Sequence, residues 1–395
     1  MLLLGKLLDS IDETDLQSLI ENQVAEAKTI EYKSELPGNS DSNKKEFLAD
    51  VSSFANASGG HLILGIEESS GTAIQIIGVE VSNLDAEKLR LENIIRDGLA
   101  PRISGLKIHN VKLINNKEVI ILEIPKSWSM PHMVTYRDHS RFYSRNSAGK
   151  YHLDVTELRS AFALSESIGK QIQDFRLERL GKIVSGETPA PVEDIPKTIF
   201  HIIPFNAFDT TNNPDITWLT NSDEIKEKLR PLHATSWGPR YNLDGFLMYS
   251  SHTFNQKSKS YIQLFRNGII ESFECKLLEP NNGHKFIPHI VFENTYIKSL
   301  EDYLQVLQKI GVEPPFIVML SLIGVLDYKI PNTSRSMITH NTIDRDSLLL
   351  PEVLIDEYTC NPAKILKPIF DSLWNAAGFA RSMNYDNEGK WKPQR

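Results

Sequence analysis

Apolar and polar residues near the N-terminus alternate in a pattern that predicts a strand, a helix and a second strand. Apolar side chains recur at the three-to-four spacing of an amphipathic helix over residues 44–57. Gly59 and Gly60 end this helix, because glycine adopts the left-handed conformations that a sharp exit needs. Residues 61–66 are an apolar run of strand length, and residues 30–33 form the earlier strand. A single connecting helix allows the two strands to pair.

Carboxylates gather around these two strands. Glu67 and Glu68 follow the apolar run directly, where a buried strand leaves the core. Side chains alternate along a strand, so Glu31 and Lys33 share one face of the earlier strand, and Glu26 lies just before it. If the strands pair, three carboxylates converge at one end of a sheet, as in a divalent-metal site. The structural alternative is a solvated Glu-Lys ion pair on one strand and a polar turn after the other.

The remaining pattern divides the chain into two domains of mixed helices and strands. In the N-terminal half it predicts helices near residues 15–20, 85–99 and 155–183, and strands over residues 74–79, 111–113, 118–124 and 141–145. Residues 184–197 have the Pro-rich, apolar-poor composition of a linker. We therefore expect an α/β N-terminal domain over residues 1–183 and an α+β C-terminal domain over residues 198–395.

The C-terminal half shows no catalytic motif. Its apolar runs predict strands over residues 199–204, 244–249, 260–266, 268–274 and 316–320. Ser299 with Asp302 opens a helix that Gly311 closes, and Asn361-Pro362 is a favourable start for a last helix. This half would position RNA or make a dimer contact, and the sequence leaves both roles open.

Composition and charge limit the partners. The 395 residues are 41% hydrophobic and 24% charged, which is ordinary for a globular protein. The net charge of -8 gives no overall attraction to nucleic acid, so a polyanion must be held by a local patch. Cys275 and Cys360 lack metal-binding or secreted-scaffold spacing, which favours a cytoplasmic protein. The apolar start is too short for a membrane span, and no membrane partner is expected.

A basic and aromatic group offers such a patch. Its members lie in or beside the strand predicted over residues 141–145, and they are Tyr136, Arg137, Arg141, Tyr143, Arg145 and Lys150. Alternation places Arg141, Tyr143 and Arg145 on one face, which suits phosphates and an unstacked base. The alternative is an edge strand whose arginines prevent sheet-to-sheet pairing.

Several classes of site are missing from the sequence. It contains no GxxxxGK[ST] phosphate loop, no GxSxG elbow, and no GxGxxG at a strand-helix junction. The histidines show no HExxH arrangement, so a zinc site is not expected. An ATP-binding accessory protein therefore has less support than a protein that acts on nucleic acid.

Three motifs carry a resemblance to a known family. The pattern E-x4-E-Y-K, the run FANASGGHLILGIEE and the run RFYSRNSAGKY resemble the AlbA-like domain of Schlafen proteins and many bacterial proteins, over about residues 15–165. The resemblance implies a mixed α/β domain that binds nucleic acid, in a single-lobe protein of the bacterial type. In some members three carboxylates carry metal-dependent endoribonuclease activity on tRNA and other structured RNA.

The resemblance also implies roles for residues. Glu26 matches the first carboxylate, Glu31 the second, and Glu67 or Glu68 the third, and together they would hold Mg²⁺ or Mn²⁺. Lys33, Arg141 and Arg145 would position the phosphate backbone. We expect an endoribonuclease that cleaves structured RNA, tRNA above all, with phage defence as the family-level role. The alternative is a non-catalytic nucleic-acid-binding or regulatory module.

The number of domain copies predicts a homodimer. Mammalian Schlafen cores resemble two copies of this domain around a basic groove, and this chain has one recognisable copy. Pairing two chains about a two-fold axis would rebuild the groove. The alternative is a monomer in which the C-terminal domain forms the second wall.

Overall fold

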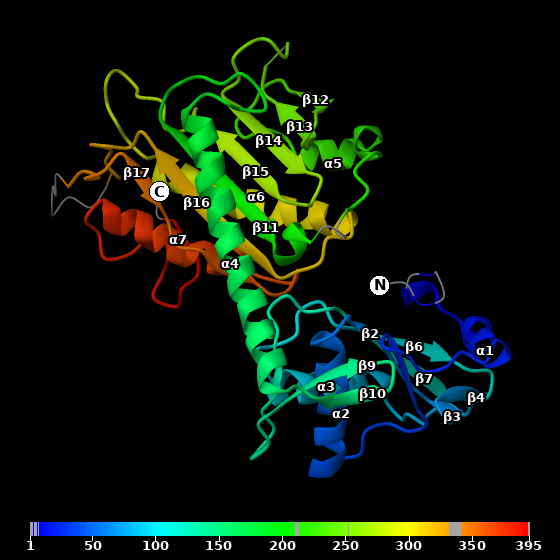
Figure 1. The fold of residues 1–395 in the computed structure, drawn as a ribbon. Coiled ribbons are helices and arrows are strands. Elements are labelled where there is room, and N and C mark those ends of the chain that lie inside the picture. Colours follow the sequence, from blue (N-terminus) through cyan, green and yellow to red (C-terminus); the bar gives the residue numbers. More distant parts are fainter. Residues whose placement is uncertain are drawn as a thin grey trace. The chain divides into compact units, whose positions relative to one another are not determined.

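The computed structural model describes residues 3, 6, 8–209, 213–251, 253–331 and 341–393. The chain forms two compact units, Met1–Gly169 and Lys170–Arg395, and each combines helices with sheets as expected (Figure 1). The units divide inside a long helix, α4 (Val155–Val184), whereas the sequence places the linker after that helix. Residues 185–196 lie outside helices and strands.

The first unit is built on a four-stranded sheet. Its order is β1-β2-β7-β6, with the bounds Ile30–Lys33, Gly60–Leu64, Glu118–Ile124 and Lys107–Lys112. The predicted pairing is confirmed: β1 and β2 are parallel, with Lys33 opposite Leu64. The predicted strand 61–66 is in fact interrupted at Gly65, whose φ of +105° turns the chain into a separate hairpin of β3 (Ile66–Ser69) and β4 (Thr72–Ile76).

Helix α2 (Asp41–Ala55) positions the candidate site. Its last nine residues are all buried, because it contacts the central sheet and also a second sheet, of order β10-β9-β8-β5. The bounds of that sheet are Gly149–His152, Arg141–Asn146, Met133–Val134 and Leu99–Ala100. On the opposite face of the central sheet, α1 (Glu13–Glu21) covers a second apolar cluster. Helix α3 (Leu84–Gly98) packs beside α2.

The end of α2 is fixed by a polar side chain and by two glycines. Asn56 donates to the carbonyls of His132 (2.9 Å) and Tyr143 (2.8 Å), and it accepts from the His132 N–H (2.7 Å). Gly59 has φ +71°, and a Cβ on Gly60 would lie 2.5 Å from the Thr29 carbonyl oxygen. Their roles are therefore structural.

The second unit is an eight-stranded antiparallel sheet with helices on both faces. The order is β12-β13-β14-β15-β11-β16-β17, and β18 also pairs with β16. The bounds are Gly238–Tyr241, Gly245–Tyr249, Ser260–Phe265, Ile270–Glu274, Lys197–Pro204, Phe316–Ile323, Ser347–Leu349 and, for β18, Val353–Ile355. The C-terminal half of α4 crosses one face, and α6 (His289–Lys309) lies on the other with α7 (Pro362–Ala376) beside it (Figure 1).

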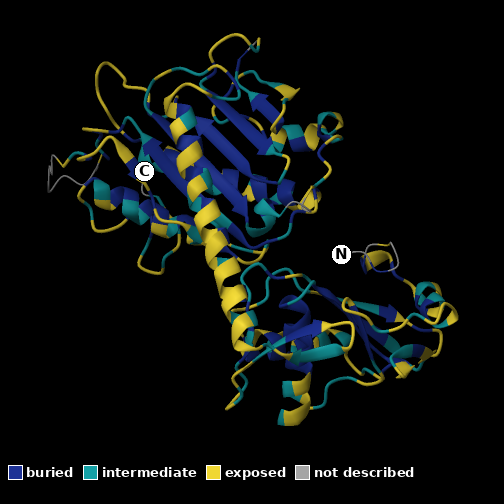
Figure 2. Ribbon diagram, in the orientation of Figure 1, coloured by how far each residue is buried: buried dark blue, intermediate teal, exposed yellow. Residues whose placement is uncertain are grey.

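Figure 2 shows the strands of this sheet buried, while α4 keeps an exposed side. Short α5 (Asp223–Lys228) packs against α6. The predicted start of α6 at Ser299 is wrong by ten residues. Phe292 and Tyr296 already bury aromatic rings on the same helix, and the Ser299 hydroxyl donates to the Thr295 carbonyl (2.7 Å) inside it rather than capping it.

Candidate nucleic-acid interface and carboxylate cluster

Glu31 lies at the edge of the central sheet, on the face that α2 covers. Its Oε1 is 2.6 Å from Lys33 Nζ, and its Oε2 accepts from Arg145 Nη1 at 2.8 Å. Burial by itself would raise the pKa of this carboxyl, but the two cations outweigh burial and lower it. Glu31 is therefore an ionised, doubly paired carboxylate.

Glu26 faces Glu31 and Glu68. Its Oε1 accepts from the Tyr32 N–H at 3.0 Å, and a Cβ on Gly71 would lie 3.7 Å from its Oε2. Burial raises the pKa of Glu26, and the negative charges of Glu31 and Glu68 raise it further. Glu26, Glu31 and Glu68 are called the carboxylate cluster below.

The β3–β4 hairpin distinguishes the two candidates for the third carboxylate. A bulge between Glu67 and Glu68 shifts the register, so that Glu67 pairs with Gln75 and Glu68 with Ala73. The Oε2 of Glu68 accepts the Gly71 N–H within the hairpin turn. Both side chains are exposed, but only Glu68 acts on the charge of Glu26.

The carboxylate cluster does not fit a metal ion as it stands. Within the described ranges, no three His, Cys, Asp or Glu side chains are arranged to hold one. Both oxygens of Glu31 are already taken by cations, and one oxygen of Glu68 is used in its own turn. We therefore assign no step to Mg²⁺ or Mn²⁺.

Asp50 extends the cluster and was not among the predicted residues. Its side chain is only 2% exposed, with Oδ1 at 2.6 Å from Lys150 Nζ and Oδ2 at 3.8 Å from Lys33 Nζ. Burial and the charge of Glu31 raise its pKa to about 6. The sequence held a signal: Asp50 falls between Phe47 and Phe54 on the apolar stripe of the helix.

The sequence predicts an exposed strand face that carries two guanidinium groups with an aromatic ring between them, and the structure differs from this prediction. Arg141, Tyr143 and Arg145 do share a face, but that face packs on α2 toward its buried end. The Arg145 guanidinium is 2% exposed and lies 3.7 Å from the centre of the Phe54 ring. Lys150 is likewise held by Asp50 and Glu46. Arg145 therefore organises the interior, and Lys150, 21% exposed, is occupied by two carboxylates.

Comparisons with known proteins identify the first unit. The family model "Schlafen, AlbA_2" matches residues 26–154. Residues 26–154 form a Schlafen AlbA_2 domain. This is a nucleic-acid-related family that includes nucleases. The match covers the carboxylate cluster, α2 and the β9–β10 hairpin, and it ends just before α4.

Two solved structures are similar to parts of the chain. The DIP2311 protein from Corynebacterium diphtheriae is 17% identical over 37% of this chain and 27% of its own, with a TM-score of 0.26. The N-terminal domain of a putative ATP-dependent DNA helicase RecG-related protein from Nitrosomonas europaea is 21% identical over 28% of this chain and 71% of its own, with a TM-score of 0.22. The chain thus spans about a quarter of the DIP2311 protein. No curated protein matches, and no helix among the described residues is long and apolar enough to cross a membrane.

The Schlafen AlbA_2 domain carries an aromatic and basic surface on its β9–β10 hairpin. The Tyr143 ring has two histidine neighbours: the His152 ring is tilted against it with centroids 4.6 Å apart, and the His139 ring lies at its hydroxyl edge with centroids 6.0 Å apart. The Tyr143 hydroxyl is 2.8 Å from His139 Nε2. Burial lowers the pKa of His139, and the positive charges of Lys45 and Arg141 lower it further. These five residues are called the β9–β10 surface below.

The cations of the β9–β10 surface are available to a ligand. Arg141 is exposed and Lys45 half-exposed, and neither has an ion-pair partner in the described part of the chain. Arg137 is 63% exposed but pairs with Asp41 at the start of α2. Of the basic residues predicted for nucleic acid, Arg137 and Arg141 are thus at the surface, whereas Arg145 and Lys150 are not. The two histidines were missed, because nothing in their spacing links them to Tyr143.

Proposed function

We propose that this Schlafen AlbA_2 domain binds nucleic acid through the β9–β10 surface, with structured RNA, tRNA above all, as the ligand. The supporting observation is the pair of Tyr143 and His152 rings, 4.6 Å apart between centroids, beside Lys45 and Arg141, which have no ion-pair partner in the described part of the chain. Exposed rings stack on unpaired bases, and neighbouring cations hold the phosphates. The net charge of -8 makes such a local patch necessary.

Removing the rings tests this proposal. His152→Ala and Tyr143→Leu should each weaken RNA binding about ten-fold, because one stacked base contributes roughly 1–3 kcal/mol. Fluorescence anisotropy with labelled tRNA and a single-stranded RNA measures the affinity. The matched control is Tyr151→Leu, because Tyr151 lies on the same hairpin but bonds Glu157 through its hydroxyl. Equal affinities for all four proteins would overturn the proposal.

A second candidate function is endoribonuclease activity on the same RNA. What motivates it is that the charges of Glu31 and Glu68 both act on Glu26, so that negative charge gathers near the end of β1. Lys33 lies beside Glu31, with its Nζ 2.6 Å from Oε1, and would contact a phosphate bound there. For this activity, Glu31 would have to release Lys33 and Arg145 and bind a metal ion in their place. A role in phage defence would depend on the nuclease activity.

Cleavage assays separate the two candidates. Glu31→Gln should abolish cleavage of tRNA in the presence of Mn²⁺, with EDTA as the chemical control. Glu67→Gln is the matched variant, because Glu67 is exposed on the same hairpin as Glu68 and does not act on Glu26. If neither the wild type nor the variants cleave tRNA, RNA binding alone remains as the proposed function.

We also expect the working unit to be a homodimer. Helix α4 exposes apolar side chains, and they are Val155, Phe162, Leu177 and Val184. Exposed apolar residues on one long helix suit a two-fold contact. Light scattering at low micromolar concentration should give twice the chain mass of 44.8 kDa. The chain mass itself, in a protein that binds RNA, would rule the dimer out.

A further inference from the structure

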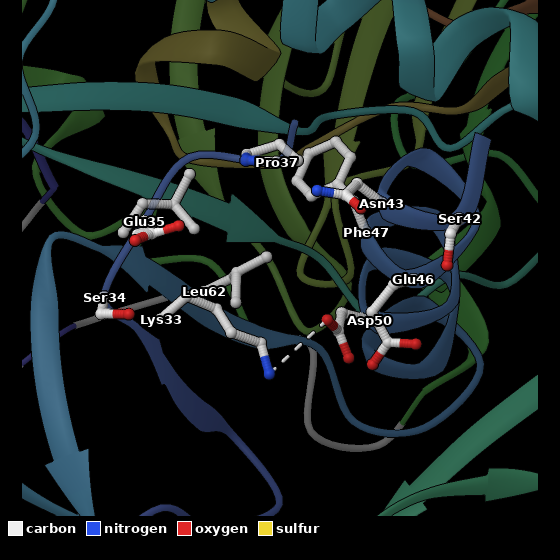
Figure 3. A pocket seen from close by; sticks show the side chains of 11 residues that line it. Lys33, Ser34, Glu35, Pro37, Ser42, Asn43, Glu46, Phe47, Asp50 and Leu62 are labelled. Atoms are coloured by element: carbon white, nitrogen blue, oxygen red, sulfur yellow. Dashed lines mark ion pairs between the residues drawn. The ribbon is translucent and has the colours of Figure 1, made fainter. Parts of the chain in front are cut away.

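A pocket of about 410 Å³ lies beside the carboxylate cluster and has Lys33 in its lining. It is bounded by the end of β1, the loop after it, the first half of α2, and β2 (Figure 3). The volume falls in the usual range for small-molecule and cofactor sites. All of its lining residues belong to the Schlafen AlbA_2 domain.

The pocket has two unlike walls. Pro37, Phe47 and Leu62 give it an apolar side, and the last two are almost fully buried. Glu46 and Asp50 give it a carboxylate side, one helical turn apart on α2, and their carboxylates lie near each other in Figure 3. A flat heterocycle has apolar faces and a polar edge, so its shape matches both walls.

The carboxylate wall is held in place by a cation from outside the pocket. Lys150 on β10 binds Glu46 and Asp50 together. Lys33 stands at the other side, 39% exposed, with its Nζ 3.8 Å from Asp50. The accessible acceptor oxygens are therefore those of Glu46, which is 63% exposed, and Lys33, which also pairs with Glu31 at 2.6 Å, stands at the edge.

Acceptor oxygens distinguish among the four bases of RNA. An ionised carboxylate only accepts hydrogen bonds. Guanine presents two adjacent donors, N1–H and N2–H₂, on its Watson–Crick edge, which match the two oxygens of one carboxylate. Adenine and cytosine place a ring-nitrogen acceptor beside their amino group, and uracil flanks its single N–H with two carbonyls. A carboxylate thus accepts two hydrogen bonds from the edge of guanine but only one from adenine, cytosine or uracil, which favours guanine.

We infer that this pocket receives one unpaired guanine, with the exposed Glu46 carboxylate accepting from its Watson–Crick edge, Asp50 fixing Lys150 behind it, and Lys33 at its O6 or the adjoining phosphate. Pro37, which is partly exposed, contacts one face of the base. This assignment rests on the proposed RNA binding and names the base that the domain selects. It uses the carboxylates next to the cluster, and not the cluster itself.

Mononucleotides test the pocket apart from RNA binding. Isothermal titration with GMP, AMP, CMP and UMP should show GMP binding about ten-fold more tightly than the other three. Glu46→Gln should remove that preference, because the amide replaces one acceptor by a donor. Ser42→Trp should block all four, since Ser42 is exposed at the mouth. Glu92→Gln, an exposed glutamate on α3 outside the pocket, is the matched control.

The same proteins are then titrated with guanine-containing and guanine-free single-stranded RNA. A guanine preference that both pocket variants lose supports the assignment. RNA binding without any base preference, with GMP no tighter than AMP, overturns the pocket and leaves the RNA-binding proposal standing. GMP binding that Ser42→Trp abolishes, in a protein that binds no RNA, supports the pocket and overturns the RNA-binding proposal.

Discussion

Two buried carboxylates, Asp50 in the first unit and Glu271 in the second, show opposite behaviour. Glu271 is fully buried on β15, and it accepts from Arg179 twice at 2.8 Å, from Tyr261 at 2.9 Å, and faces His201 at 3.0 Å. Burial would raise its pKa, but Arg179 and His201 lower it to about 2. Asp50 is nearly as buried, yet its pKa rises to about 6.

The difference comes from the partners and from access. Four donor atoms contact the Glu271 carboxylate. Two of them belong to Arg179, which attaches α4 to the sheet. Asp50 has two lysines that reach solvent, one of them at 3.8 Å, and it lines a pocket. Burial of a charge therefore does not mark a functional site.

The largest effect should come from Glu271→Gln. The change leaves the Arg179 guanidinium buried without its counter-charge, which costs about 3–5 kcal/mol of unfolding free energy. Urea unfolding followed by tryptophan fluorescence reports mainly on the second unit, where four of the five tryptophans lie. A Glu271→Gln protein with the wild-type urea midpoint would remove the contrast with Asp50.

A smaller loss should separate two arginines of one strand. Arg145→Ala leaves Glu31 with Lys33 alone and should lower the unfolding free energy by about 2–3 kcal/mol. Arg141→Ala, at an exposed position on the same strand, should change it by less than about 0.5 kcal/mol. Thermal unfolding of the two variants compares them. Equal unfolding free energies for the two variants would show that Arg145 makes no stabilising buried contact, and would support the exposed role that the sequence predicts.

The pH dependence of the two carboxylates should have opposite signs. Folding raises the pKa of Asp50 from an ordinary 3.8 to about 6, because the folded protein binds this proton more tightly. The contribution of Asp50 to stability therefore falls as the pH rises from about 4 to about 6. Glu271 stabilises the fold above its ordinary 4.5, and this contribution is lost as pH falls toward about 2. Asp50→Asn should therefore gain up to about 2 kcal/mol relative to wild type between pH 4 and pH 6. A difference that does not vary over this range would contradict the raised pKa.

The sequence predicts the frame of the first unit well. Residues 30–33 and the helix ending at Gly59-Gly60 follow from their period and from glycine chemistry, and the pairing of β1 with β2 follows from the single helix between them. Alternation also shows that Arg141 and Arg145 share a face. It cannot show which face is inward, because α2, which covers that face, lies some 90 residues earlier in the chain.

The choice between Glu67 and Glu68 likewise depends on a feature without a sequence signal. A one-residue bulge decides which side chain turns toward Glu26. Asp50, by contrast, could have been found, because an acidic residue on an apolar helical stripe is visible in the sequence alone.

The most direct test of the account is the salt dependence of RNA binding. Each phosphate contact releases condensed counterions, so log K falls with log salt in proportion to the number of contacts. Arg141→Ala with Lys45→Ala should weaken tRNA binding and reduce the slope by about 1–2, while Arg145→Ala should leave the slope unchanged in protein that remains folded. Anisotropy titrations across a salt series give both quantities. An unchanged slope in the Arg141 and Lys45 variant, or a reduced slope in Arg145→Ala, would contradict binding through the β9–β10 surface.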